Sequence, residues 1–126
     1  MKDIAIKGNK GVYFIPTVNF NSDTGVCEII GESYHQDAKK FYRPLIQWVE
    51  EYIQSKRPIR FDFKLTYFNT NSSKAFLNIL KVLKKYADEG GQVEANWYYP
   101  TEDDDILEEA EDFIQETKLN MHLIGY

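Results

Sequence analysis

The chain contains a single cysteine, Cys27, among its 126 residues. One cysteine can form neither an intramolecular disulfide nor a thiolate zinc site, and its place in an apolar stretch favours an inert core thiol. No apolar run approaches the ~18 residues of a membrane span, and the stretch Met1–Gly8 lacks the apolar core of a signal peptide. We therefore expect a cytoplasmic protein that does not insert into a membrane.

Positive charge is also scarce, with 15 Lys and Arg against 20 Asp and Glu and a formal net charge of −5. A chain without a basic stripe cannot neutralise a phosphate backbone, so nucleic acid is not expected as its main ligand. Lys39, Lys40 and Arg43 do cluster, and we expect them on the solvated face of a helix.

Motifs for catalysis are missing as well. The sequence has no Walker-type phosphate loop and no dinucleotide fingerprint, and no nucleophile elbow surrounds Ser33. His35 and His122 are far apart and neither stands in a metal-ligand spacing, so both are expected at the surface or at an edge. We expect no enzymatic activity, no cofactor and no metal site.

What the sequence does contain is enough for one globular domain, residues 1–126. Hydrophobic residues make up 43% of the chain and aromatic residues 15%. A chain of this length can bury a real core, and no linker, repeat or low-complexity segment divides it.

The N-terminal part is predicted to form a hairpin. Residues 12–20 and 26–33 have the composition of strands, and the turn formers of residues 21–25 separate them. Pro16 cannot donate a ladder hydrogen bond, which predicts an edge strand or a bulge at this point.

The rest of the chain alternates between helical and extended patterns. Pro44 falls within the first helical pattern, where it indicates an early kink or a later start. The expected elements are a helix over 37–54, a strand over 59–68, a helix that begins near Ser72, a strand over 93–99, a helix that starts around residues 101–104 and a strand over 120–124. The order ββαβαβαβ predicts a mixed α/β sheet whose later strands are parallel and are connected by helices.

The most informative stretch lies where the strand over 59–68 gives way to the next helix. It is rich in hydroxyl and amide side chains, namely Asn69, Thr70, Asn71, Ser72 and Ser73, followed by Lys74. The first N–H groups of a helix lack intrahelical partners and carry partial positive charge, so a phosphate on Thr70 would be favoured there by roughly 0.3–1 kcal/mol. The same residue types are also the ordinary choices for helix caps and turns. A cap needs only one of them, and this redundancy favours a functional site.

A second candidate is the acidic cluster that begins at Glu102 and includes Asp103–Asp105. It lacks the alternating ligands and the glycine of a calcium loop. Acids that complement the helix dipole explain it most simply, and a divalent cation or a docking surface remains an alternative.

Four segments together resemble the SiaC-like regulatory phosphoprotein family of bacteria. The resemblance runs over nearly the whole chain, and its most specific part is the pattern Asn-Thr-x-Ser-x-Lys over residues 69–74. The segments are Gly31-Glu32-Ser33-Tyr34, Phe41-Tyr42-Arg43-Pro44-Leu45-Ile46-Gln47-Trp48, Tyr67-Phe68-Asn69-Thr70-Asn71-Ser72-Ser73-Lys74 and Asn96-Trp97-Tyr98-Tyr99 followed by acids.

The resemblance implies a STAS-like fold, the architecture of anti-sigma-factor antagonists. It also implies a partner switch that a dedicated kinase phosphorylates on Thr70 and that a PP2C-type phosphatase dephosphorylates. The unmodified form is expected to bind a partner such as a diguanylate cyclase, which links the switch to cyclic-di-GMP signalling. Asn69, Asn71, Ser72, Ser73 and Lys74 would form the surroundings of the phosphosite. Ser73 departs from the family's pattern, which leaves open a second phosphoacceptor or a better cap.

Two other functions remain as alternatives from different classes. One is a small metal-dependent enzyme that uses Asp103–Asp105, and the other is a constitutive scaffold that is never phosphorylated. The oligomeric state stays open.

Overall fold

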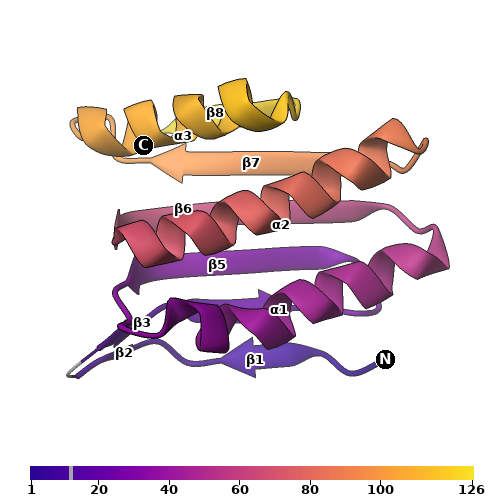
Figure 1. Ribbon diagram of the computed structural model, residues 1–126, viewed down its shortest axis with the longest axis horizontal. Coiled ribbons are helices and arrows are strands. Elements are labelled where there is room, and N and C mark those ends of the chain that lie inside the picture. Colours follow the sequence, from indigo (N-terminus) through magenta and orange to yellow (C-terminus); the bar gives the residue numbers. More distant parts are fainter. Residues whose placement is uncertain (12) are drawn as a thin grey trace.

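The computed structural model describes residues 1–11 and 13–126, and within them six strands form one mixed sheet in the order β1-β4-β5-β6-β7-β8 (Figure 1). These strands are β1 (Ile4–Ile6), β4 (Thr17–Phe20), β5 (Val26–Ser33), β6 (Ile59–Phe68), β7 (Val93–Tyr99) and β8 (Met121–Gly125). A separate two-stranded ribbon pairs β2 (Asn9–Lys10) with β3 (Phe14–Ile15). The helical elements are α1 (Ala38–Tyr52), the short 3₁₀ turn η1 (Ile53–Ser55), α2 (Thr70–Asp88) and α3 (Asp104–Thr117).

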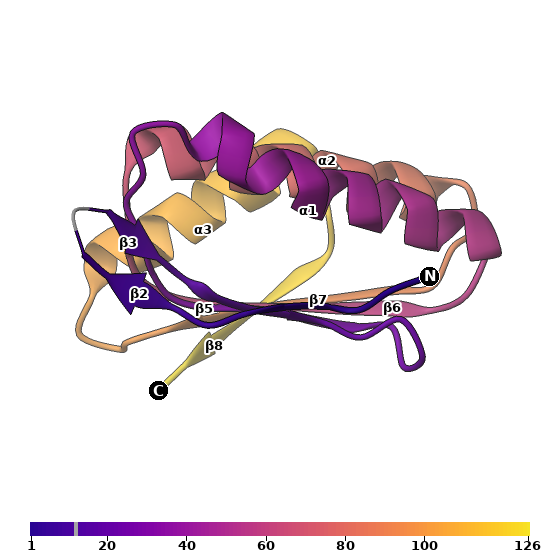
Figure 2. The same ribbon diagram turned by 90° about the horizontal axis from the view of Figure 1, so that it is seen from below.

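The predicted hairpin and the predicted parallel strands are both confirmed. Strand β4 pairs antiparallel with β5, whereas β5, β6, β7 and β8 run parallel to one another. Each parallel pair is connected by one helix, and α1, α2 and α3 all lie on the same face of the sheet (Figure 2). The α/β fold with a mixed sheet is therefore as expected. In the described part of the chain, no helix is long and apolar enough to cross a membrane.

The N-terminal region differs from the prediction. Residue 12, the first of the predicted strand 12–20, lies outside the described residues, and the rest of that strand is split into β3 and β4. Pro16 is buried at the break between them. Of the two alternatives expected at Pro16, the edge strand is wrong for β4, because β1 pairs with its other side. Pro16 instead stands where the strand is interrupted.

The core lies between the sheet and the three helices. On β6, Phe61, Phe63 and Leu65 are fully buried, as their alternation with polar residues predicted. The stripe Phe76, Ile79, Leu80, Leu83 and Tyr86 of α2 is buried against them. Aromatic rings fill much of this layer: the Phe63 ring stacks on the Trp97 ring with centroids 4.7 Å apart.

Cys27 is fully buried on β5, and burial raises the pKa of its thiol far above the usual range. A thiol without a thiolate fraction is neither nucleophilic nor a metal ligand. The prediction that Cys27 lies in the core is confirmed.

Helix starts are set by side-chain caps. The Asp37 carboxylate accepts a hydrogen bond from the Lys40 backbone N–H at 3.2 Å, so α1 begins at Ala38 and continues through Pro44. A later start at Pro44 is therefore wrong. Helix α2 begins at Thr70, two residues before the predicted Ser72, because Asn69 supplies its cap.

Candidate functional site

The polar junction lies at the edge of the sheet where β5 and β6 end. Ser33, the last residue of β5, stands beside Phe68, the last residue of β6. The first turn of α1 and the first turn of α2 start at this same edge (Figure 1). The carboxyl ends of neighbouring parallel strands are the usual place for functional residues in such sheets.

Asn69 ties the start of α2 to the chain after β5. Its side-chain oxygen accepts a hydrogen bond from the Ser72 N–H at 2.9 Å, which caps the helix. Its amide Nδ2 donates to the carbonyl oxygen of His35 at 3.3 Å, and its backbone N–H donates to the carbonyl oxygen of Ser33 at 3.1 Å. Three hydrogen bonds of Asn69 therefore hold the start of α2 in place against the end of β5 and the segment that follows it.

Thr70 is the first residue of α2, and its side chain is exposed. At this position the hydroxyl stands next to the positive end of the helix dipole. Lys74 follows one turn later and is also exposed. A hydroxyl here is accessible to another protein and lies in surroundings that favour a negative charge.

Ser72 points the other way and is fully buried. Its hydroxyl oxygen lies 2.7 Å from Ser33 Oγ, which in turn lies 2.6 Å from the Tyr42 hydroxyl. Ser72 Oγ also donates to the Ser33 carbonyl oxygen at 3.2 Å. Burial raises the pKa of Tyr42 well above its usual range, so this hydroxyl stays neutral. We call Ser33, Tyr42 and Ser72 the buried hydroxyl triad.

The structure thus separates residues that the sequence analysis had grouped as the surroundings of one site. Thr70, Asn71 and Lys74 are exposed, Ser73 is half-buried, and Ser72 belongs to the core. The burial of Ser72 could have been predicted from helical periodicity, because Ser72 precedes Phe76 by four residues and so continues the buried stripe of α2.

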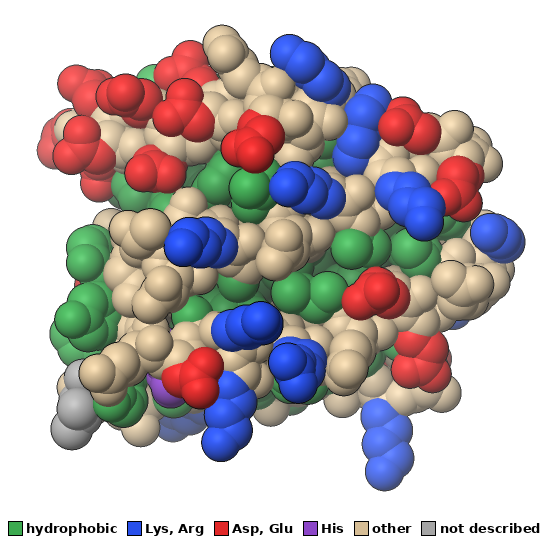
Figure 3. All heavy atoms as spheres, in the orientation of Figure 1, with side chains coloured by type: hydrophobic (Ala, Val, Ile, Leu, Met, Phe, Trp, Pro, Cys, Tyr) green, Lys and Arg blue, Asp and Glu red, His purple; other side chains and the backbone are tan. Residues whose placement is uncertain are grey.

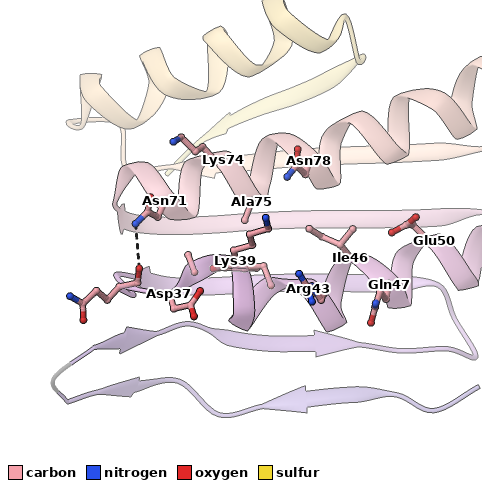
Figure 4. A pocket seen from close by; sticks show the side chains of 13 residues that line it. Asp37, Lys39, Arg43, Ile46, Gln47, Glu50, Asn71, Lys74, Ala75 and Asn78 are labelled. Carbon is pink, nitrogen blue, oxygen red and sulfur yellow. Dashed lines mark hydrogen bonds between the residues drawn. The ribbon is translucent and has the colours of Figure 1, made fainter.

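A groove runs between α1 and α2 and begins beside the junction (Figure 4). Its volume is about 570 Å³, and Asn71 Nδ2 donates across its end to the Gln36 carbonyl oxygen at 3.5 Å. Lys39 and Arg43 line it from α1, and Lys74 lines it from α2. The sequence analysis placed Lys39, Lys40 and Arg43 on a solvated helix face. All three are exposed, but the groove itself was missed.

Two aromatic side chains are exposed at the same edge of the molecule. Tyr34 is 45% exposed and Tyr67 is 46% exposed, with ring centroids 6.3 Å apart. Phe14 lies against Tyr34 at 6.3 Å. Figure 3 shows hydrophobic side chains gathered at this edge. Tyr67 lies beyond the point where the register of β5 and β6 shifts between Gly31 and Glu32, so the burial of every second residue of β6 does not extend to it.

The acidic cluster caps and begins α3. The Asp103 carboxylate accepts a hydrogen bond from the Ile106 N–H at 3.1 Å, and Asp104 and Asp105 lie exposed in the first turn. Figure 3 shows Asp and Glu side chains gathered over α3. Among the residues that the structure describes, no three His, Cys, Asp or Glu side chains come together as a metal site would require. Asp103 thus caps α3, and Asp104 and Asp105 complement the dipole of this helix.

The two histidines lie apart. His35 Nδ1 accepts a hydrogen bond from the Asp37 N–H at 2.9 Å, and its ring stacks on Tyr13. His122 is exposed on β8, with Nδ1 3.1 Å from Asn96 Oδ1.

Comparison with known proteins connects this geometry to one family. Residues 6–126 match the model of the SiaC family of regulatory phosphoproteins. A Pseudomonas aeruginosa protein described as uncharacterised is 30% identical over 114 residues, which are 90% of this chain and 88% of that protein.

Solved structures agree with the sequence match. The crystal structure of apo-SiaC from Pseudomonas aeruginosa superimposes with a TM-score of 0.89 at 27% identity, covering 98% of this chain and 99% of that one. The crystal structure of the diguanylate cyclase SiaD in complex with its activator SiaC, from the same organism, contains a chain with a TM-score of 0.90 at 26% identity. That match covers 98% of this chain and 100% of the other.

Proposed function

The chain belongs to the SiaC family of regulatory phosphoproteins, and from that membership we propose that it is a partner switch whose phosphoacceptor is Thr70. The observation that carries the proposal is the contrast within one helical turn. Thr70 presents its hydroxyl to solvent at the start of α2, whereas the hydroxyl of Ser72 is buried and hydrogen-bonded.

The fold should survive the modification. A phosphate adds about −1.5 to −2 charges, and at the first position of α2 these charges face the positive end of the helix dipole. Lys74, one turn along the same helix, can pair with the phosphate without disturbing the core. Phosphorylation would therefore change what the surface binds and leave the structure intact.

Phosphorylation of Thr70 would instead weaken the binding of a partner. A partner that covers Thr70 would have to bury an unpaired dianion, which costs several kcal/mol and separates bound from free states by orders of magnitude. SiaC of Pseudomonas aeruginosa has been crystallised with a diguanylate cyclase that it activates. By analogy, the unmodified form of this protein would bind and regulate a diguanylate cyclase in the cytoplasm. A dedicated kinase and a PP2C-type phosphatase would determine the fraction of the protein that is unmodified and available to bind the partner.

Intact-mass and phosphopeptide mass spectrometry on the protein isolated from its own cells tests the acceptor. We expect one phosphate on the peptide that contains Thr70, its removal by phosphatase, and its absence from a Thr70→Ala variant. A Ser73→Ala variant is the matched control and should remain phosphorylated. Stoichiometric phosphate on Thr70→Ala would refute the assignment.

A binding experiment separates the switch from a constitutive scaffold. Thr70→Glu should lose the partner that wild type binds, whereas Thr70→Ser should keep it. Equal binding by wild type and Thr70→Glu would favour the scaffold.

A further inference from the structure

Tyr34 and Tyr67 are exposed side by side, which is unusual for this molecule. Among the described residues four large hydrophobic side chains are exposed, and the other two, Met1 and Tyr126, are the first and last residues of the chain. Tyr34 and Tyr67 come from different segments, yet their ring centroids lie 6.3 Å apart. Exposed aromatic side chains that cluster in this way are typical of binding surfaces.

The backbone holds this cluster in place. The Phe14 N–H donates to the Tyr34 carbonyl oxygen at 2.8 Å, and the Tyr34 N–H donates to the Phe14 carbonyl oxygen at 2.9 Å. Tyr67 lies beside Glu32 in the parallel pairing of β5 and β6. The residues that carry the three rings and the carboxylate are therefore positioned before a ligand arrives, which lowers the entropic cost of binding.

The same side chains line a pocket of about 520 Å³, together with Gly11. We call Phe14, Glu32, Tyr34 and Tyr67 the aromatic pocket. Among the described residues that line it, only Glu32 is charged. Its side chain is only 25% exposed, so its carboxylate has lost much of its water and gains from a positive partner. The lining thus combines the faces of aromatic rings, which attract cations, with one negative charge.

One cation of the chain already lies near this carboxylate. Lys10 Nζ is 3.5 Å from Glu32 Oε1, but the Lys10 side chain is 69% exposed and is not part of the lining. An ion pair this exposed contributes little, because water and salt screen it. In the described part of the chain, cations lie over the rings of Tyr52 and Tyr126 and over none of the rings of the aromatic pocket. Lys10 therefore competes only weakly with an incoming cation and leaves the rings free.

We propose that the aromatic pocket receives an arginine side chain of a protein partner. A guanidinium is planar, so it stacks on a tyrosine ring and can donate two hydrogen bonds to a carboxylate. Charge complementarity selects this occupant, because Glu32 would repel an anion and a neutral apolar side chain would leave the carboxylate without a new partner. Tyr34 and Tyr67 are nearly half exposed, so a side chain presented by another protein can reach them.

This proposal rests on the proposed function for the existence of a partner, and it identifies one contact that the partner makes. Thr70 follows Tyr67 by three residues, and the Asn69 N–H between them donates to the Ser33 carbonyl oxygen at 3.1 Å. A partner that covers Thr70 can therefore reach the aromatic pocket in the same contact. Phosphorylation of Thr70 changes neither the rings nor Glu32, so the pocket can be tested on the unmodified protein.

The test is an NMR titration of the ¹⁵N-labelled full chain with the capped tripeptide Gly-Arg-Gly. In the first control peptide citrulline replaces arginine, which keeps nearly the same shape and removes the charge. In the second, lysine keeps the charge without the planar group. We expect saturable chemical-shift changes at the aromatic pocket and binding at least about fivefold weaker for the citrulline peptide. The lysine peptide should bind with intermediate affinity.

Substitutions identify the residues. Glu32→Gln and Tyr67→Leu should each weaken Gly-Arg-Gly at least about fivefold, because the first removes the charge and the second removes a ring. Lys10→Ala should strengthen it about two- to fivefold, because it removes the competing cation. Glu28→Gln is the matched control for Glu32→Gln, since Glu28 is also half-buried and lies on β5 about 13 Å away. It should leave affinity within about twofold.

Several results would overturn the site: no saturable binding of Gly-Arg-Gly, equal binding of the citrulline peptide, tighter binding of the lysine peptide, shifts confined to another surface, full affinity in Glu32→Gln, or weaker binding by Lys10→Ala. Preferential binding of guanosine monophosphate at the same residues would overturn it in favour of a nucleotide site, because a base also stacks on tyrosine. Because the titration uses unmodified protein, its outcome does not depend on whether Thr70 is phosphorylated in cells. Failure of the aromatic pocket and failure of the switch are thus distinguishable.

Discussion

The hydroxyl oxygen of Ser72 lies 2.7 Å from that of Ser33, across the contact between α2 and the end of β5. Both side chains are buried, so neither group can turn to water if the other is removed. Together with Tyr42 on α1, this pair joins the three elements that meet beside Thr70.

Ser72→Ala should lower the free energy of unfolding by about 1–3 kcal/mol, because it leaves Ser33 Oγ and the Ser33 carbonyl oxygen each short of a buried partner. Urea denaturation followed by circular dichroism measures this. Ser73→Ala, one position along the helix and only half-buried, should stay within about 0.5 kcal/mol of wild type. Equal stability of both variants would show that the buried hydroxyl triad contributes nothing.

Asn69→Ala should destabilise the protein by about 1 kcal/mol through loss of the α2 cap. Asn69→Asp keeps the oxygen that accepts from the Ser72 N–H and should recover most of that stability. The recovery will be incomplete if the 3.3 Å hydrogen bond from Asn69 Nδ2 to the His35 carbonyl oxygen also contributes. Thermal unfolding of wild type, Asn69→Ala and Asn69→Asp at one pH separates the contribution of the cap from that of the hydrogen bond to His35.

Thr70→Glu should raise stability by about 0.3–1 kcal/mol at low salt, because the added carboxylate faces the positive end of α2. Thr70→Gln has nearly the same size without the charge and serves as the control. The gain should shrink in 1 M NaCl, where the Debye length is about 3 Å. A Thr70→Glu protein that unfolds more easily than Thr70→Gln would contradict the view that a phosphate leaves the fold intact.

Glu109 on α3 predicts a pH dependence. The side chain is exposed, but its partial desolvation on α3 raises the pKa of its carboxyl, and repulsion from Asp112, Glu108 and Asp105 raises it further. An acid whose pKa is higher in the folded state loses stability as the pH rises through that pKa. Glu109→Gln should therefore raise the melting temperature at pH 7, and the difference from wild type should fade at a pH below the ordinary pKa of glutamate. A constant difference across this range would contradict the assignment.

Gly25 should tolerate alanine far less well than Gly90. Both have positive φ, +75° and +94°, so alanine is strained at either position by about 1–2 kcal/mol. A Cβ at Gly25 would also collide with the Tyr52 hydroxyl and the Pro58 carbonyl oxygen, whereas nothing lies within 4 Å at Gly90. Gly25→Ala should therefore cost at least about 1–3 kcal/mol more than Gly90→Ala, as overpacking does. Urea unfolding of the two variants gives the difference directly.

The strong periodic patterns of the sequence were sufficient to predict most of the fold. The bounds of β6 and β7 agree with the prediction, and α2 starts within two residues of the expected position. Strand β1 was missed because three residues carry no readable alternation, and its pairing with β4 depends on residues that are distant in the sequence. That missing partner is also why the edge-strand alternative for Pro16 was wrong.

The site was predictable in part. Side-chain chemistry pointed to residues 69–74, and the position of Asn69 as the cap follows ordinary helix preferences. The groove could not be predicted in the same way, because it depends on how α1 and α2 sit side by side on the sheet. The residue pattern of a single helix does not determine the distance between the two helices.

The three hydrogen bonds that hold Asn69 also determine how Thr70 is presented to other molecules. Its backbone is already helical, and the preceding residue, Asn69, is bonded to the end of β5, to the segment before α1 and to the first turn of α2. Any enzyme that adds or removes a phosphate here meets a conformational epitope assembled from separate stretches of the chain. A short peptide spanning residues 65–75 would lack that surface, so recognition would follow the shape of the folded protein rather than the local sequence.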